Sequence, residues 1–185
     1  MNEGSGVAAT ALFVEILVVG VGALSGLSIL ITGIWFPRGL ENVPSLDGSI
    51  LLGLGISLAY ALGILVDRWA DALLTKARHA LRSQYFASDL EYAEARVKAN
   101  ATPSYALRAE YAKSRIRVCR GWMLNSVIIS WSAIIFVARN EEIDHRLLAI
   151  IFCAVAGPLL GSAFFFAWRG MIDQGYKNTE QQAKP

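Results

Sequence analysis

The stretch VEILVVGVGALSGLSILITGIWFP, which covers residues 14–37, is almost entirely apolar and carries one carboxylate, Glu15. A helix that spans a membrane needs about 20 predominantly apolar residues, and this stretch supplies them. Glu15 stands near the start of the run, so the helix would place it close to one face of the bilayer and away from its centre. The stretch therefore predicts a transmembrane helix with a charged group near one end.

Three further segments are long and apolar enough to cross a membrane, and the composition agrees with them. Only 17% of the residues are charged, against about 25% in ordinary soluble domains. The predicted spans are residues 7–35, 50–66, 122–138 and 147–168. The first is longer than a straight crossing requires, so we expect it to tilt or to project from the bilayer. The predicted fold class is an all-α membrane protein with four transmembrane helices.

The distribution of basic residues predicts how the chain is threaded. With four spans, both termini and residues 68–120 share one side of the membrane. The opposite side carries only Arg38, Arg139 and Arg146, each near acidic residues. Basic residues on the shared side are Arg68, Lys76, Arg78, Arg82, Arg96, Lys98, Arg108, Lys113, Arg115, Arg117, Arg120, Arg169, Lys177 and Lys184. Cytoplasmic loops carry an excess of Lys and Arg, so both termini are predicted to be cytoplasmic in the inner (plasma) membrane.

Residues 68–120 are predicted to form a cytoplasmic helical hairpin that extends the second and third spans. Apolar residues recur at helical spacing on both sides of a tip, where Ser88 and Glu91 form a capping box and Thr102-Pro103 starts a new helix. The two arms could bury each other's apolar stripe, or a neighbouring subunit or a docked protein could cover it. The predicted division is residues 1–67 with spans one and two, 68–120 as the hairpin, 121–169 with spans three and four, and 170–185 as a cytoplasmic tail.

The basic residues of this hairpin are candidates for contact with a partner or with lipid. Cations next to a membrane attract anionic lipid, and those at the tip are positioned to meet a soluble protein. Nucleic acid would require a denser basic patch with exposed aromatic residues between the charges, which disfavours it as a partner. The candidate residues are Arg96, Lys98, Arg108, Lys113, Arg115, Arg117 and Arg120.

Small residues recur at four-residue spacing in three of the spans. Such stripes let helix backbones approach closely, which favours association in a membrane. The second span carries stripes on two faces, so we expect it to be central, with neighbours on both sides. The predicted packing residues are Gly22, Gly26, Gly53, Gly55, Ala59, Gly63, Gly157 and Gly161.

A few polar side chains lie inside the predicted spans. Asn125, Ser126 and Ser130 interrupt the aliphatic third span, where they either form hydrogen bonds between helices or line a pore. Glu15 is the other candidate for an intramembrane polar role. Pairing with Arg120 or Arg169 of an adjacent helix, or solvation at the interface, is favoured over a gating or ion-binding role.

The motifs of common enzymes and metal sites are absent from the sequence. It contains no phosphate-binding loop, nucleophile elbow, zinc-protease helix or Cys/His cluster, and only two histidines. Two cysteines lie inside predicted helices without metal-ligand spacing. The sequence therefore predicts a protein that is not an enzyme and that has no catalytic residues, metal or cofactor.

In layout the whole chain resembles the small four-span membrane subunits of bacterial antiphage defence, such as the membrane subunit of the Kiwa system. The resemblance depends on four spans, two cytoplasmic termini and a helical hairpin between spans two and three. It implies a homo-oligomer that senses membrane disturbance and recruits a cytoplasmic effector. No residue role is carried over, because no motif is matched.

Three functions follow from these features. The leading hypothesis is a non-enzymatic, homo-oligomeric membrane sensor or scaffold that docks a soluble cytoplasmic protein. The rival is a pore or ion channel that depolarises the membrane. A small-solute transporter is disfavoured, because coupled transporters usually carry an ionisable residue near the middle of a span and these spans do not.

Overall fold

The computed structural model describes residues 3–35, 47–101 and 103–184, and this part of the chain is built of helices. The helices are α1 (Glu3–Trp35), α2 (Gly48–Arg82), α3 (Asp89–Asn100), α4 (Pro103–Arg139) and α5 (Arg146–Ala183). Helices α1, α2, α4 and α5 are long and apolar enough to cross a membrane. The predicted all-α fold with four transmembrane helices is therefore confirmed. Arg38 falls among the residues that the structure leaves undescribed.

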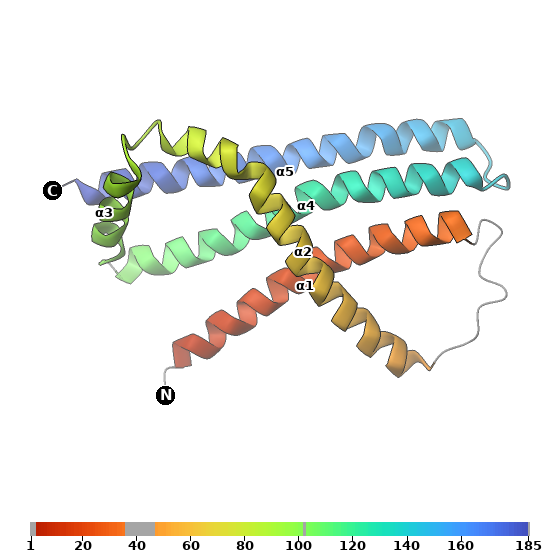
Figure 1. Ribbon diagram of the computed structural model, residues 1–185, viewed down its shortest axis with the longest axis horizontal. Helices are drawn as coiled ribbons and strands as arrows, with labels where there is room; N and C mark the ends of the chain where they lie inside the picture. Colours follow the sequence, from red (N-terminus) through yellow and green to blue (C-terminus); the bar gives the residue numbers. More distant parts are fainter. Residues whose placement is uncertain (1–2, 36–46, 102, 185) are drawn as a thin grey trace.

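The helix at the centre of the arrangement is α4, which contacts all four other helices. Figure 1 shows α4 and α5 side by side, α1 next to α4 on the side away from α5, and α2 crossing the others diagonally. The prediction that the second span is central is therefore wrong within the chain. The first half of α2 lies on the side of the crossing point where α1 and α2 diverge (Figure 1). Gly53 and Gly55 in this half therefore face no other helix.

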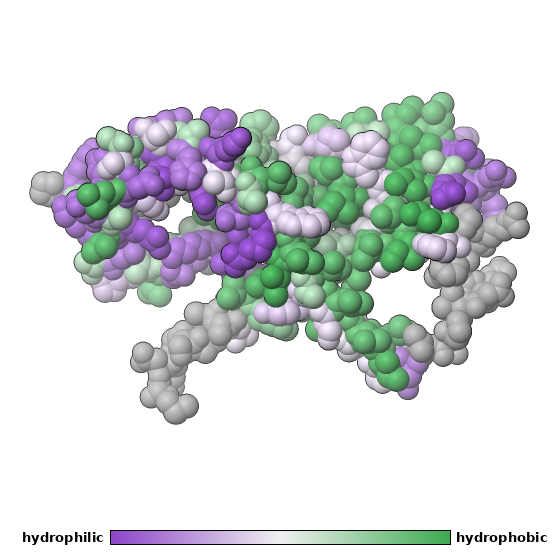
Figure 2. All heavy atoms as spheres, in the orientation of Figure 1, coloured by the Kyte–Doolittle hydropathy of each residue, from purple (hydrophilic) through white to green (hydrophobic). Residues whose placement is uncertain are grey.

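Polar residues gather at one end of the molecule, which we call the polar end. It consists of residues 71–119, with α3 at its tip, and residues 169–183 of α5. Figure 2 shows this end as a continuous hydrophilic region beside the apolar spans. The start of α1 and the end of α5 face the same way as α3, opposite the turn at residues 140–145 (Figure 1).

The tip of the polar end forms from local signals in the sequence. Ser88 caps α3, because its Oγ accepts a hydrogen bond from the Glu91 backbone N–H at 3.1 Å. The Glu91 carboxylate accepts in turn from the Ala87 backbone N–H at 2.7 Å. Helix α4 begins at Pro103, where the missing N–H costs nothing. The predicted cap and proline start are confirmed, and Thr102 lies outside the described residues.

The C-terminal segment, predicted as a cytoplasmic tail at residues 170–185, is helical as far as Ala183, because α5 continues into it. Trp168 and Tyr176, two turns apart on α5, are buried in a core with Leu74 and Leu81 of α2 and with the turn residue Phe86. Ile116 and Cys119 of α4 pack against the same core. Helix α5 therefore covers part of the hairpin's apolar surface, an alternative that was not predicted, whereas Trp69 and Leu73 are 62% and 66% exposed.

Candidate functional site: an ion-paired junction and a basic cavity

Where α2 crosses α4, the side chain of Arg120 lies between two carboxylates of α2. Asp67 and Asp71 are four residues apart and therefore share a face of that helix. Arg120 Nε and Nη2 donate to Asp67 Oδ1 at 3.0 and 2.7 Å, and Nη1 donates to Asp71 Oδ1 at 2.5 Å. Arg78 Nη1 also donates to Asp71 Oδ1, at 3.0 Å. One arginine thus ties two turns of α2 to α4.

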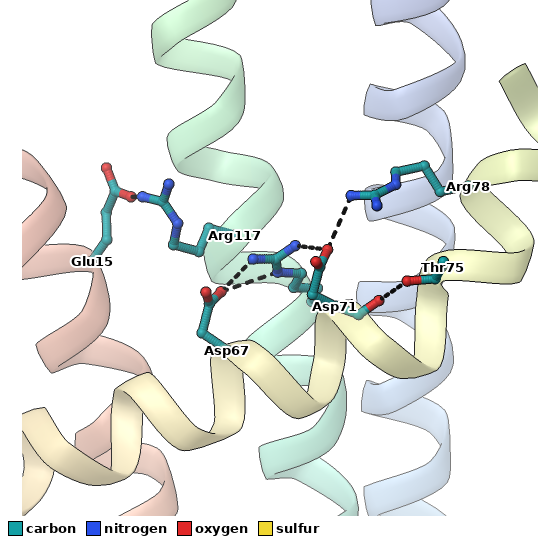
Figure 3. A network of polar contacts seen from close by, with 7 residues as sticks. Glu15, Asp67, Asp71, Thr75, Arg78 and Arg117 are labelled. Carbon is teal, nitrogen blue, oxygen red and sulfur yellow. Dashed lines mark hydrogen bonds and ion pairs between the residues drawn. The ribbon is translucent and has the colours of Figure 1, made fainter. Parts of the chain in front are cut away.

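A second ion pair links α1 to α4 one turn away. Arg117 Nη1 donates to Glu15 Oε2. Figure 3 shows the carboxylates of α1 and α2 directed at the arginine side chains of α4. Together with the Arg120 contacts, this pair forms what we call the junction: Glu15, Asp67, Asp71, Arg78, Arg117 and Arg120. Three carboxylates balance three guanidinium groups, so the junction is neutral as a whole.

Within the junction, the Asp67–Arg120 pair is buried deeply enough for its pairing to matter energetically. Asp67 is 6% exposed, and the side chain of Arg120 is 15% exposed. Removing one partner of a buried pair leaves an uncompensated charge, which costs about 3–5 kcal/mol. The junction therefore fixes how α1, α2 and α4 are placed at the start of the polar end.

The junction corrects two predictions made from the sequence. Glu15 does pair with an adjacent helix, but its partner is Arg117 and not Arg120 or Arg169. Arg117 and Arg120 were candidates for contact with lipid or a partner, whereas both are neutralised inside the chain. Asp67 and Asp71 were not predicted as site residues. The sequence pattern that could have indicated them is two carboxylates four residues apart at the end of an apolar span.

The polar residues of the third span face neighbouring helices within the chain. Asn125 is fully buried, and its Nδ2 donates to the Val19 carbonyl of α1 at 2.6 Å, while its Oδ1 has no partner. Ser130 Oγ donates to the Cys153 carbonyl of α5 at 2.5 Å, and Ser126 Oγ donates to the Met123 carbonyl of its own helix at 3.0 Å. The bonds of Asn125 and Ser130 connect helices, as one of the two interpretations expected.

The predicted packing glycines divide into two groups. Gly22 and Gly26 of α1 face α4, Gly63 faces α1, and Gly157 and Gly161 of α5 face α4. A Cβ at Gly63 would lie 2.1 Å from the Ile16 carbonyl oxygen, so the backbones touch there. Ala59 is buried at the same crossing, against Gly20, which the sequence analysis missed. In contrast, a Cβ at Gly53 or Gly55 would meet nothing within 4 Å.

A cavity of about 490 Å³ opens in the polar end between α3, α4 and α5, and it reaches the junction. Figure 2 shows the hydrophilic end hollowed between these helices. Six cationic side chains line it, and its described lining contains no carboxylate. These are Arg78, Arg96, Arg108, Lys113, Arg117 and Arg120. The predicted contact residues Arg96, Arg108 and Lys113 thus converge on one cavity.

The remaining candidate cations lie outside the cavity lining. Arg115 stacks on the ring of Tyr111, 5.2 Å from its centroid. Lys98 is exposed in the last turn of α3. These two positions therefore serve as surface controls for the residues that line the cavity.

The described residues show no group of three or more His, Cys, Asp and Glu side chains that could hold a metal ion. The fold and the junction together define a multi-pass α-helical membrane protein with a folded polar end. Comparison with known proteins finds no matching family model, no similar curated protein and no similar solved structure.

Proposed function

We propose that this protein is a non-enzymatic, homo-oligomeric scaffold of the inner membrane whose polar end docks a soluble cytoplasmic protein. In this proposal both termini and the polar end are cytoplasmic, as the excess of basic residues on that side favours. The partner presents an apolar patch with an acidic group at the end that meets Lys98.

The observation that carries the proposal is an exposed apolar pair on α3, a helix that is not among the candidate spans. Leu90 and Val97 are 69% and 72% exposed. They are seven residues apart, which places them on one face of the helix. Lys98 and Arg96 stand beside Val97, whereas two carboxylates of α3 flank Leu90. Exposed apolar residues rimmed by polar ones are typical of interaction sites, and α3 lies at the tip of the polar end, away from the apolar spans (Figure 1 and Figure 2).

The junction supports a sensing role for the same scaffold. Because Arg117 and Arg120 tie α1 and α2 to α4, a rearrangement of the spans would move the base of the polar end. The resemblance to four-span subunits of antiphage defence gives this coupling a role: membrane disturbance would alter the docking surface. A sensor requires two arrangements of one element, each favoured by a different state of the membrane.

Site-specific photo-crosslinking tests the docking role. A photoreactive residue in place of Val97 should yield a discrete adduct with a soluble protein in native cells, and Lys98→Glu should reduce its yield. The matched control places the photoreactive residue at Glu142, in the turn at the opposite end of the molecule. Equal adducts from both positions, or an adduct insensitive to Lys98→Glu, would contradict a specific docking surface.

Cysteine labelling tests the proposed orientation separately. In a variant with Cys119 and Cys153 replaced by serine, Ala87→Cys should resist an impermeant reagent in intact cells, and Glu142→Cys should react. The opposite labelling pattern would invert the topology and place the docking surface outside the cell.

A further inference from the structure

We propose that the cavity of the polar end binds a soluble small molecule that carries a phosphate monoester. This site shares only Arg96 with the docking surface on α3 and goes beyond the scaffold function. The volume of about 490 Å³ lies within the range of small-molecule sites, about 300–1,000 Å³.

The charge balance of the lining points to an anion. Arg117, Arg120 and Arg78 are neutralised by the junction carboxylates, and Lys113 pairs with Glu110. Two lining cations remain, Arg96 of α3 and Arg108 of α4. Within the described residues, neither lies within ion-pair distance of a carboxylate. Both side chains are exposed to water and line one cavity, so their guanidinium groups are available to an anion that enters it.

The size of the uncompensated charge selects the kind of anion. Two guanidinium groups carry a charge of +2, and a phosphate monoester carries about −1.5 to −2 at pH 7. Arginine also binds phosphate through two parallel hydrogen bonds, which a point charge cannot do. The charge of the two unpaired arginines is therefore balanced by one phosphate monoester.

Part of the cavity lining is apolar and suits an apolar or aromatic portion of the ligand. Ala109, Ala112 and Ile116 of α4 and Ile172 of α5 line it together with the Tyr105 ring. The Tyr105 hydroxyl lies 2.6 Å from Thr179 Oγ1, so α4 is bonded to α5 across the lining. Because this bond fixes the two walls, the cavity is formed before any ligand enters.

The position of the unpaired arginines along α4 favours a soluble ligand over a lipid headgroup. Arg120 lies two residues before Trp122, where the third predicted span begins. Arg108 precedes Arg120 by twelve residues of continuous helix, about 18 Å at a rise of 1.5 Å per residue. A helix tilt of about 40° still leaves about 14 Å. A headgroup layer is only about 5–7 Å thick, so a lipid in the bilayer would not reach Arg108.

Calorimetric titration of the full chain in neutral maltoside detergent tests the proposal, with three probes. Adenosine monophosphate should bind saturably, inorganic phosphate more weakly, and adenosine not at all. Arg96→Gln and Arg108→Gln should each weaken binding of adenosine monophosphate by about tenfold or more, since each removes a charge-assisted hydrogen bond. Arg115→Gln is the matched control on α4 and should leave binding unchanged. All variants should keep the wild-type melting temperature, because these side chains are exposed.

A second arm separates a soluble ligand from a lipid. Affinity for adenosine monophosphate should be the same in nanodiscs of phosphatidylcholine and in nanodiscs that also contain phosphatidylglycerol. No binding of either phosphate probe, or binding that neither glutamine variant weakens, overturns the proposal. Stabilisation by phosphatidylglycerol alone, lost in Arg108→Gln, overturns it in favour of a lipid site. Arg96 adjoins the docking surface on α3, whereas Arg108 does not. Only Arg108→Gln therefore changes the cavity without changing the docking surface, and this variant distinguishes failure of the cavity site from failure of docking.

Discussion

Both halves of α2 carry small residues, but the surroundings of these residues differ. Residues 48–58 carry Gly53 and Gly55, and a Cβ at either would meet nothing within 4 Å. In residues 59–82, Ala59 and Gly63 lie against α1, and Asp67 is paired with Arg120. Small residues permit a close approach of helices but do not cause it. What distinguishes the packed half is a pair of carboxylates that a neighbouring helix neutralises.

The largest expected effect comes from removing the charge that anchors the packed half. Arg120→Gln leaves Asp67 buried without a counter-ion, so we expect a loss of about 3–5 kcal/mol in the free energy of unfolding. SDS titration of the protein in mixed micelles, followed by circular dichroism, measures it. The double variant Asp67→Asn/Arg120→Gln should recover much of the loss. If Arg120→Gln alone matched the wild type, the junction would not anchor α2.

A matched pair of glycine substitutions tests the comparison most directly. Gly63→Ala places a Cβ 2.1 Å from the Ile16 carbonyl oxygen, so the helices must separate, at a cost of about 1–3 kcal/mol. Gly53→Ala meets open space and should be neutral or slightly stabilising, because alanine favours helix by about 1 kcal/mol. The same unfolding titration compares them.

The Gly53 position also tests the proposed homo-oligomer. If Gly53→Ala or Gly55→Ile lowered the mass seen by native mass spectrometry while Gly63→Ala did not, the open half of α2 would be the contact between subunits. If no substitution in residues 48–58 changed the mass, this half of α2 would face lipid.

The ion pair of α1 should have a smaller effect than that of α2. The side chains of Glu15 and Arg117 are 11% and 27% exposed, and Arg117 also lines the cavity, where water can solvate it. We therefore expect Glu15→Gln to cost about 1–2 kcal/mol, between the values for exposed and buried pairs. A loss as large as that of Arg120→Gln would show that the two pairs act as one unit. The double variant Glu15→Gln/Arg120→Gln separates these cases, because independent sites add.

Hydropathy and the spacing of short motifs were sufficient to predict the four spans, the cap at Ser88 and the start of α4 at Pro103. They were insufficient where contacts between distant segments decide the outcome. Residues 170–183 have few apolar side chains, so only contact with α2 and the turn at Phe86 explains why α5 continues to Ala183. The cavity was missed for the same reason, because α5 forms one of its walls. Glu15 was predicted to pair, but the choice between Arg117 and Arg120 depends on the angle at which α2 crosses α4.

The smallest effect is expected at Asn125, and it separates hydrogen bonding from steric packing on the packed side. Asn125 is fully buried between α1 and α4, where a Cβ at Gly22 would lie 2.5 Å from its Nδ2. Its hydrogen bond to the Val19 carbonyl should contribute only about 0.6 kcal/mol, the average for such bonds in a membrane protein. Asn125→Ala removes both this bond and the unpartnered Oδ1, whose burial is itself unfavourable, and adds no atoms beside Gly22. The two terms oppose each other, so the free energy of unfolding should change by less than about 1 kcal/mol. Gly33→Ala, whose Cβ would lie 2.8 Å from the Phe136 Cα of the α4 backbone, should cost more. If Asn125→Ala proved the more damaging of the two, α1 would be held to α4 by this hydrogen bond, and close backbone contact would be secondary on this side of the molecule.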